Sequence, residues 1–185
     1  YGRGPFAKFL DALGVDWHWW EPTGLSPVAY LDALGLLGPR ALLVHGVELS
    51  SFDIGLIAER GASLCLCPRS NRWISGHLPN VSALIQASVQ LCIGTDSLGS
   101  NGSLDLFDEI VELGRSFPEI GMETWLIAAT ENGSQALGLD GLGRIAIGSC
   151  PGLLWLPETQ NPEAIRLGPP IVREWLTRPG RAYGN

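Results

Sequence analysis

The sequence predicts an α/β fold built around a parallel sheet. Three short runs are apolar throughout rather than alternating, which is typical of strands buried on both faces of a parallel sheet. Segments with helix signals lie between them, and right-handed crossovers from strand to strand then make the sheet parallel. The three runs are residues 41–44, 63–67 and 90–93.

Each apolar run ends in residues that can do chemistry. His45 follows the first run, an Arg-Ser-Asn turn at 69–71 follows the second, and Asp96 follows the third. In α/β folds the ligand lies at the carboxyl ends of the strands, because the loops converge there. We therefore expect His45, the 69–71 turn and Asp96 to face one shared pocket.

The segments around the runs have the start and stop residues of helices. Ser50 to Asp53 resembles a capping box, Gly61 is a suitable terminator, and Asn80 and Ser103 are suitable N-caps. The helices expected on this basis are 6–13, 28–34, 54–59, 81–87, 104–115, 123–129 and 132–137.

The composition changes at Gly138. Beyond it, 141–148 and 153–156 are expected to form two short strands, and prolines recur through the tail. We therefore predict a main α/β domain at 1–137, followed at 138–185 by a small β appendage and a proline-rich arm.

The bulk composition excludes several classes of protein. At 185 residues the chain fits one domain with a sizeable core, and 45% apolar with 17% charged residues excludes disorder. A net charge of −7 without a basic cluster argues against nucleic acid as a partner. No apolar run is long enough to span a membrane and the first residues lack a signal-peptide pattern, so we expect a cytoplasmic protein.

The four cysteines do not suggest a disulfide framework. Three of them lie inside the apolar runs, where a thiol acts as a small hydrophobic group. Cys65 and Cys67 would share one face of a strand and could form a metal pair, but no second Cys or His pair completes a zinc site.

In their order along the chain, these motifs resemble those of a known superfamily. A strand ending in His-Gly at 45–46, the sequence Cys-Pro-Arg-Ser-Asn at 67–71 and Gly-Thr-Asp-Ser at 94–97 with a following Ser-Asn are similar to the amidohydrolase superfamily. The similarity is greatest to its metal-dependent aminohydrolases and chlorohydrolases, which include adenosine, S-adenosylhomocysteine and aminofutalosine deaminases. It covers residues 4–156.

The resemblance implies a (β/α)₈ TIM-type barrel with a small β domain. It maps His45, Pro68 and Asp96 to the ends of strands six, seven and eight, so this chain would be the second half of a barrel. The paired metal histidines and the His-x-x-Glu motif of the family have no counterpart, because the three histidines are His18, His45 and His77. Either the chain is a fragment of a longer enzyme or it has lost its metal centre.

The resemblance also implies catalytic roles. Asp96 would bind zinc and accept a proton from water, although an aspartate there could simply cap the next turn. His45 would orient the attacking hydroxide, and Gly46 beside it would leave room for a ligand. Glu48 imitates the His-x-x-Glu motif but lies one strand too late, so it is expected in solvent.

Further residues are candidates for substrate binding or for loop support. The substrate-binding candidates are Ser70, Asn71, His77 and Ser97, of which Ser70 and Asn71 are also ordinary turn residues. Many relatives carry a histidine just before the Cys-Pro pair, where this chain has Leu66. That difference affects the choice of substrate rather than hydrolysis.

The leading hypothesis is a zinc-dependent hydrolytic deaminase acting on a small molecule with an aminated purine-like ring. Another divalent metal such as Fe²⁺ could replace zinc. A chlorohydrolase would use the same attack with chloride leaving, and an inactive half-barrel that binds a partner is the non-enzymatic alternative. A nucleotide-binding sheet has only Gly-Leu-Gly at 141–143 in its favour. The sequence leaves open whether the protein forms a homo-oligomer.

Overall fold

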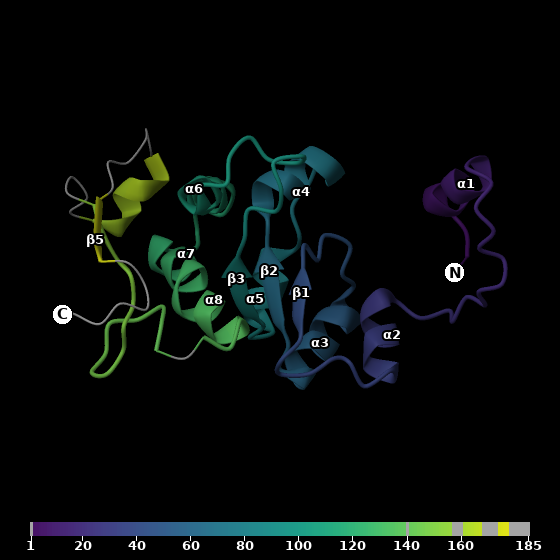
Figure 1. Ribbon diagram of the computed structural model, residues 1–185, viewed down its shortest axis with the longest axis horizontal. Coiled ribbons are helices and arrows are strands. Elements are labelled where there is room, and N and C mark those ends of the chain that lie inside the picture. The colour runs from purple at the N-terminus through teal and green to yellow at the C-terminus, as the bar shows by residue number, and fades with distance from the viewer. Residues whose placement is uncertain (1, 140, 157–160, 168–173, 178–185) are drawn as a thin grey trace.

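A parallel sheet of three strands lies at the centre of the molecule (Figure 1). The computed structural model describes residues 2–139, 141–156, 161–167 and 174–177. The strands β1 (Leu42–Val44), β2 (Ser63–Leu66) and β3 (Gln90–Ile93) pair in the order β1-β2-β3, and both pairings are parallel. The predicted parallel sheet and its three strands are confirmed.

The two faces of this sheet differ. Leu43, Leu64 and Leu91 are aligned across the strands. Leu64 and Leu91 belong to the main hydrophobic core with Ile54 and Leu84 from the helices, and the partly buried Leu43 packs against it. The next aligned row, on the other face, is Val44, Cys65 and Cys92. Val44 remains 49% exposed on that face. The carboxyl ends of all three strands therefore meet at one edge above a well-packed core.

Helix α3 (Ser51–Arg60) follows β1 and begins with the capping box that the sequence predicts. The Ser50 hydroxyl accepts the amide of Asp53, and the Asp53 carboxylate accepts the amide of Ser50 at 3.0 Å. Asp53 is 4% exposed and also accepts the hydroxyl of Ser26, the N-cap of α2 (Pro27–Ala33). One carboxylate therefore joins the start of α2 to the start of α3.

An Asp53→Asn variant should lose stability in a pH-dependent way. Burial opposes ionisation of Asp53, but the hydroxyls of Ser26 and Ser50 donate to the carboxylate and hold its pKa below the ordinary value. A depressed pKa adds stability above the unfolded-state pKa, and that stability is lost as pH falls through the folded-state pKa. At pH 7 we expect the free energy of unfolding to drop by about 1–2 kcal/mol. Urea unfolding of wild type and variant at several pH values measures this loss. If the difference in free energy of unfolding stayed constant down to acidic pH, the Asp53 carboxylate would not be the source of the pH dependence.

The helices that precede and follow β3 pack against that strand. Helices α6 (Leu106–Ser116), α7 (Met122–Ala129) and α8 (Glu131–Ala136) follow β3, and Asn132 of α8 donates its side-chain amide to the Leu91 carbonyl at 2.9 Å. Helix α5 (Val81–Gln86) precedes β3. Helix α1 (Pro5–Ala12) buries none of its residues and lies at one end of the molecule (Figure 1). Among the described residues, no helix has the length and apolar character needed to cross a membrane.

Two predictions near the strand ends, a turn at 69–71 and a helix start at Ser103, were wrong in part. Residues 68–75 form helix α4 (Pro68–Ser75) where the sequence suggested a turn. Its N-cap, Cys67, makes no capping hydrogen bond through its side chain, so the usual N-cap signal was absent, while proline at the first position suits a helix start. Helix α6 is capped by Asp105, which accepts the Phe107 amide at 3.0 Å, rather than by Ser103.

The C-terminal region contains a separate two-stranded antiparallel sheet. It pairs β4 (Leu153–Trp155) with β5 (Glu174–Thr177), and the 3₁₀ helix η1 (Pro162–Leu167) lies between them in sequence. The strand predicted at 141–148 is wrong. Its glycines 141, 143 and 148 have φ of 82°, 77° and 82°, which an extended strand does not allow. Much of the predicted proline-rich arm lies outside the described residues.

Candidate functional site

His45 lies immediately after β1 in a sharply turned backbone. Its φ is 71°, and the Gly46 amide donates to the Val44 carbonyl at 3.0 Å, which closes a three-residue γ-turn around His45. The ring Nδ1 lies 2.8 Å from the Asn71 amide oxygen. Because that oxygen only accepts, Nδ1 carries the hydrogen, and Nε2 of the neutral ring is an acceptor.

Asp96 lies three residues beyond the end of β3, in the loop at the same edge of the sheet. Its Oδ2 accepts the hydroxyl of Ser70 at 2.6 Å and that of Ser100 at 2.8 Å. These two hydroxyls, with the nearby His45 imidazole, hold the pKa of Asp96 below the ordinary value for aspartate. Asp96 is therefore an ionised, oriented carboxylate at the edge of the sheet.

The backbone at both positions is unusual. Three non-glycine residues in the described chain have positive φ, and two of them are His45 and Asp96 at 71° and 59°. Histidine and aspartate tolerate the left-handed region better than most residues, and such strained positions are common at functional sites.

The first turn of α4 connects the two residues. Ser70 and Asn71 follow β2, the middle strand, and are 0% and 2% exposed. Ser70 holds Asp96, and its neighbour Asn71 holds His45. The structure therefore brings His45, Ser70, Asn71 and Asp96 together at one edge. The Asn71 side-chain oxygen contacts His45, while its side-chain nitrogen is buried without a hydrogen-bond partner.

The other predicted site residues lie on exposed loops. His77 Nε2 lies 3.1 Å from Glu48 Oε1, and their side chains are 55% and 84% exposed. Glu48 is thus in solvent, as expected. Ser97 is exposed, and its hydroxyl accepts the Gly99 amide at 3.3 Å. The sequence analysis did not identify the Ser100 hydroxyl as a partner of Asp96. The available signal was its short separation of four residues from Asp96.

Gly46 has a different role from the one predicted. A Cβ at this position would lie 2.9 Å from Leu49 Cδ1 and 2.9 Å from Leu64 Cδ2. The space beside Gly46 is therefore filled by core leucine side chains, and it is not room for a ligand.

The cysteines are free thiols, as the sequence predicts. Cys65 contacts both Cys67 and Cys92. The Cys67 contact lowers the pKa of Cys65, but Cys92 and burial outweigh it and raise that pKa to about 12. The Cys65 thiol is therefore protonated at neutral pH and acts as a buried apolar group.

The donor set at the strand ends fits part of a metal site. A carboxylate kept ionised by two hydroxyls is a ligand type that zinc accepts. Across the residues that the structure describes, however, no three side chains of His, Cys, Asp or Glu gather in a group that could hold a metal ion. Asp96 thus fits one position of a zinc site, and the described chain does not supply a complete one.

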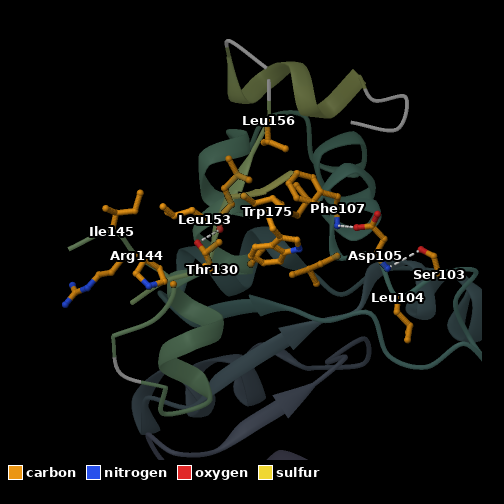
Figure 2. A pocket seen from close by; sticks show the side chains of 18 residues that line it. Ser103, Leu104, Asp105, Phe107, Thr130, Arg144, Ile145, Leu153, Leu156 and Trp175 are labelled. Atoms are coloured by element: carbon orange, nitrogen blue, oxygen red, sulfur yellow. Dashed lines mark hydrogen bonds between the residues drawn. The ribbon is translucent and has the colours of Figure 1, made fainter. Parts of the chain in front are cut away.

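A large cavity lies elsewhere in the molecule. It has a volume of about 970 Å³ and lies between α6, α7 and the β4–β5 sheet. Its wall is mostly apolar, and Figure 2 shows Phe107, Leu153 and Trp175 among the side chains that line it. None of the predicted site residues lines this cavity.

Comparison with known proteins identifies the family of this chain. The model of the amidohydrolase family matches residues 22–161. A 5-methylthioadenosine/S-adenosylhomocysteine deaminase of Nitratidesulfovibrio vulgaris is 37% identical over 138 residues, which are 71% of this chain and 31% of that protein. A 5'-deoxyadenosine deaminase of Methanothermobacter thermautotrophicus is 36% identical over 147 residues, 75% of this chain and 34% of that protein.

A solved structure gives the same result. The crystal structure of an adenosine deaminase from Xanthomonas campestris with bound zinc aligns at a TM-score of 0.61 and 38% identity, covering 67% of this chain and 30% of that one. A parallel α/β sheet with an imidazole after β1 and a carboxylate after β3, both held by the first turn of α4, is an arrangement suited to hydrolysis. The chain belongs to the amidohydrolase family, and it spans about a third of the length of the relatives it matches.

Proposed function

We propose that this chain is the C-terminal part of a zinc-dependent hydrolytic deaminase that acts on an aminated purine-like ring. The observation that carries the proposal is the pairing of His45 and Asp96 through the first turn of α4. The matched relatives are deaminases of adenosine-type nucleosides, which supports an aminated purine as substrate.

In this proposal β1, β2 and β3 are strands six, seven and eight of a (β/α)₈ barrel. Residues 1–137 then belong to the barrel, and 138–185 to a small β appendage with its arm. The separate pairing of β4 with β5 supports a boundary before the appendage. The remaining zinc ligands, or those of another divalent metal such as Fe²⁺, would come from the part of the barrel that this chain does not contain.

The residues of this chain would divide the work of hydrolysis. When bound, zinc lowers the pKa of water to near neutrality. Asp96, kept ionised by Ser70 and Ser100, would accept the proton of the attacking water on its carboxylate. His45, with Nδ1 donating to Asn71, would accept a hydrogen bond from the attacking water at Nε2 and so orient that water. We propose His77 and Ser97, on the exposed loops beside this edge, as substrate contacts.

The proposal is tested with the complete protein that contains this chain. Given zinc, it should release ammonia from S-adenosylhomocysteine or 5'-methylthioadenosine. This chain alone should bind zinc only weakly, because it contributes one ligand, and metal analysis after dialysis measures that. Stoichiometric tight zinc on the chain alone would contradict the fragment proposal, and a zinc-loaded complete protein without ammonia release would contradict deamination.

Two alternatives predict different results in the same experiment. A chlorohydrolase would release chloride from a chlorinated ring and no ammonia from the nucleosides. An inactive half-barrel that binds a partner is favoured by the incomplete donor set and by Val44, which is 49% exposed at the unpaired edge strand β1. That alternative predicts neither product, even when zinc is supplied.

A further inference from the structure

Glu109 of α6 is a fully buried carboxylate that none of the proposed catalytic steps uses. It is 0% exposed, and each of its oxygens accepts a hydrogen bond from a different segment. Oε1 accepts the side-chain amide of Asn101 at 2.6 Å, and Oε2 accepts the backbone amide of Arg69 at 3.1 Å. Asn101 lies in the loop after β3 and Arg69 in the first turn of α4, so Glu109 connects the two segments that position Asp96.

The contact through Asn101 reaches the backbone of Asp96. The Asn101 side-chain amide donates to Glu109 and also to the Thr95 carbonyl at 2.8 Å. That carbonyl belongs to the peptide unit whose nitrogen is the backbone nitrogen of Asp96. The hydrogen bond holds this peptide plane in place and so restrains rotation about the N–Cα bond of Asp96. The φ angle of that bond is 59°, which is unfavourable for most residues.

The contact through Arg69 reaches the carboxylate of Asp96. Arg69 directly precedes Ser70, whose hydroxyl donates to Asp96 Oδ2 at 2.6 Å. The Arg69 guanidinium is itself held by Asp108 at 2.8 Å and lies 3.9 Å from Glu109. The Ser100 hydroxyl supports the Asp96 carboxylate from within its own loop. The other two supports, Asn101 on the backbone of Asp96 and Ser70 on its side chain, are both connected to the same buried carboxylate, that of Glu109.

Packing alone does not explain a carboxylate at this position. Burial raises the pKa of Glu109, and the Asn101 and Arg69 hydrogen bonds only partly oppose it. An apolar side chain would avoid the cost of removing a charge from water. A second glutamate on the same helix, Glu112, pairs with Arg72 of α4 and is 25% exposed, so it joins the same two helices without burial.

We propose that Glu109, acting through Asn101 and Arg69, is a positioning residue that sets the direction of the Asp96 carboxylate. The proposal rests on the proposed function for its effect on turnover. Its effect on the Asp96 backbone does not depend on that function. The two effects can therefore be measured separately.

The test compares Glu109→Gln with Glu112→Gln as a matched control. Glutamine keeps the shape of glutamate, but its amide nitrogen cannot accept a hydrogen bond. Either the Asn101 side-chain amide or the Arg69 backbone amide therefore loses its acceptor. In the chain as given, we expect amide hydrogen exchange at residues 95–97 to accelerate about tenfold in Glu109→Gln and to stay unchanged in Glu112→Gln. In the complete protein, kcat should fall about 10- to 100-fold with KM within about twofold.

A double variant, Glu109→Gln with Asn101→Asp, separates positioning from stability. The carboxylate introduced at position 101 accepts the amide introduced at position 109, and the glutamine oxygen still accepts the Arg69 backbone amide, but nothing donates to the Thr95 carbonyl. Stability should recover toward wild type while exchange at 95–97 stays fast and kcat stays low.

Two results would overturn the proposal. One is recovery of kcat together with stability in the double variant, and the other is wild-type exchange at 95–97 in Glu109→Gln. If wild type releases no ammonia, the proposed function fails, and the exchange comparison alone decides the role of Glu109.

Discussion

An Asp96→Asn variant of the complete protein is expected to release ammonia at least about a thousandfold more slowly than wild type. Asparagine tolerates the left-handed backbone that Asp96 adopts at a φ of 59°, so the loop keeps its shape. Its amide oxygen still accepts the hydroxyls of Ser70 and Ser100. The variant therefore changes the charge and the proton-accepting ability of one side chain and little else.

The control for this prediction is Asp16→Asn, because Asp16 lies in an N-terminal loop with a side chain that is 83% exposed. It makes the same chemical change away from the strand ends and should keep wild-type turnover. Initial rates of ammonia release, with metal content measured on the same samples, give the comparison. Wild-type turnover in Asp96→Asn would remove Asp96 from the mechanism and leave the strand-end pairing without a catalytic purpose.

The sequence predicts the strand ends well, because the signals there are local. Each apolar run is short and bounded by polar residues, and the parallel pairing then places His45 and Asp96 at one edge. The capping box at Ser50 is equally local, since its two hydrogen bonds join residues three apart. Long-range contacts, such as those of Glu109 with residues 8 and 40 positions away, have no such signal.

Predictions failed where the deciding contact is remote or the backbone is special. Helix α4 has no side-chain N-cap, and the tertiary contacts of Ser70 and Asn71 with the neighbouring strand ends hold its first turn. The segment at 141–148 is apolar enough for a strand, but three glycines with positive φ turn the chain instead. The role of Gly46 was also missed, because the leucine that limits it, Leu64, lies on another strand.

Gly46→Ala should be the most damaging small substitution near the site, lowering the free energy of unfolding by about 2–4 kcal/mol. The φ of Gly46 is 66°, which strains any residue with a Cβ. The new methyl would also lie 2.9 Å from Leu49 and from Leu64, and Leu64 is 0% exposed in the core and has little freedom to move. Because Leu64 has little freedom to move, the γ-turn around His45 would have to change shape to relieve this crowding.

Gly55→Ala provides the control, because Gly55 lies inside α3 and a Cβ there meets no atom within 4 Å. That variant should gain about 0.5–1 kcal/mol from the better helix propensity of alanine. The same glycine-to-alanine change is thus expected to lower the free energy of unfolding at position 46 and to raise it at position 55. Urea unfolding of both variants measures the two changes. If Gly46→Ala were as stable as wild type, the leucines would have room to move and the γ-turn would not depend on glycine. The orientation of His45 would then rest on its hydrogen bond to Asn71 and not on the packing of the loop behind it.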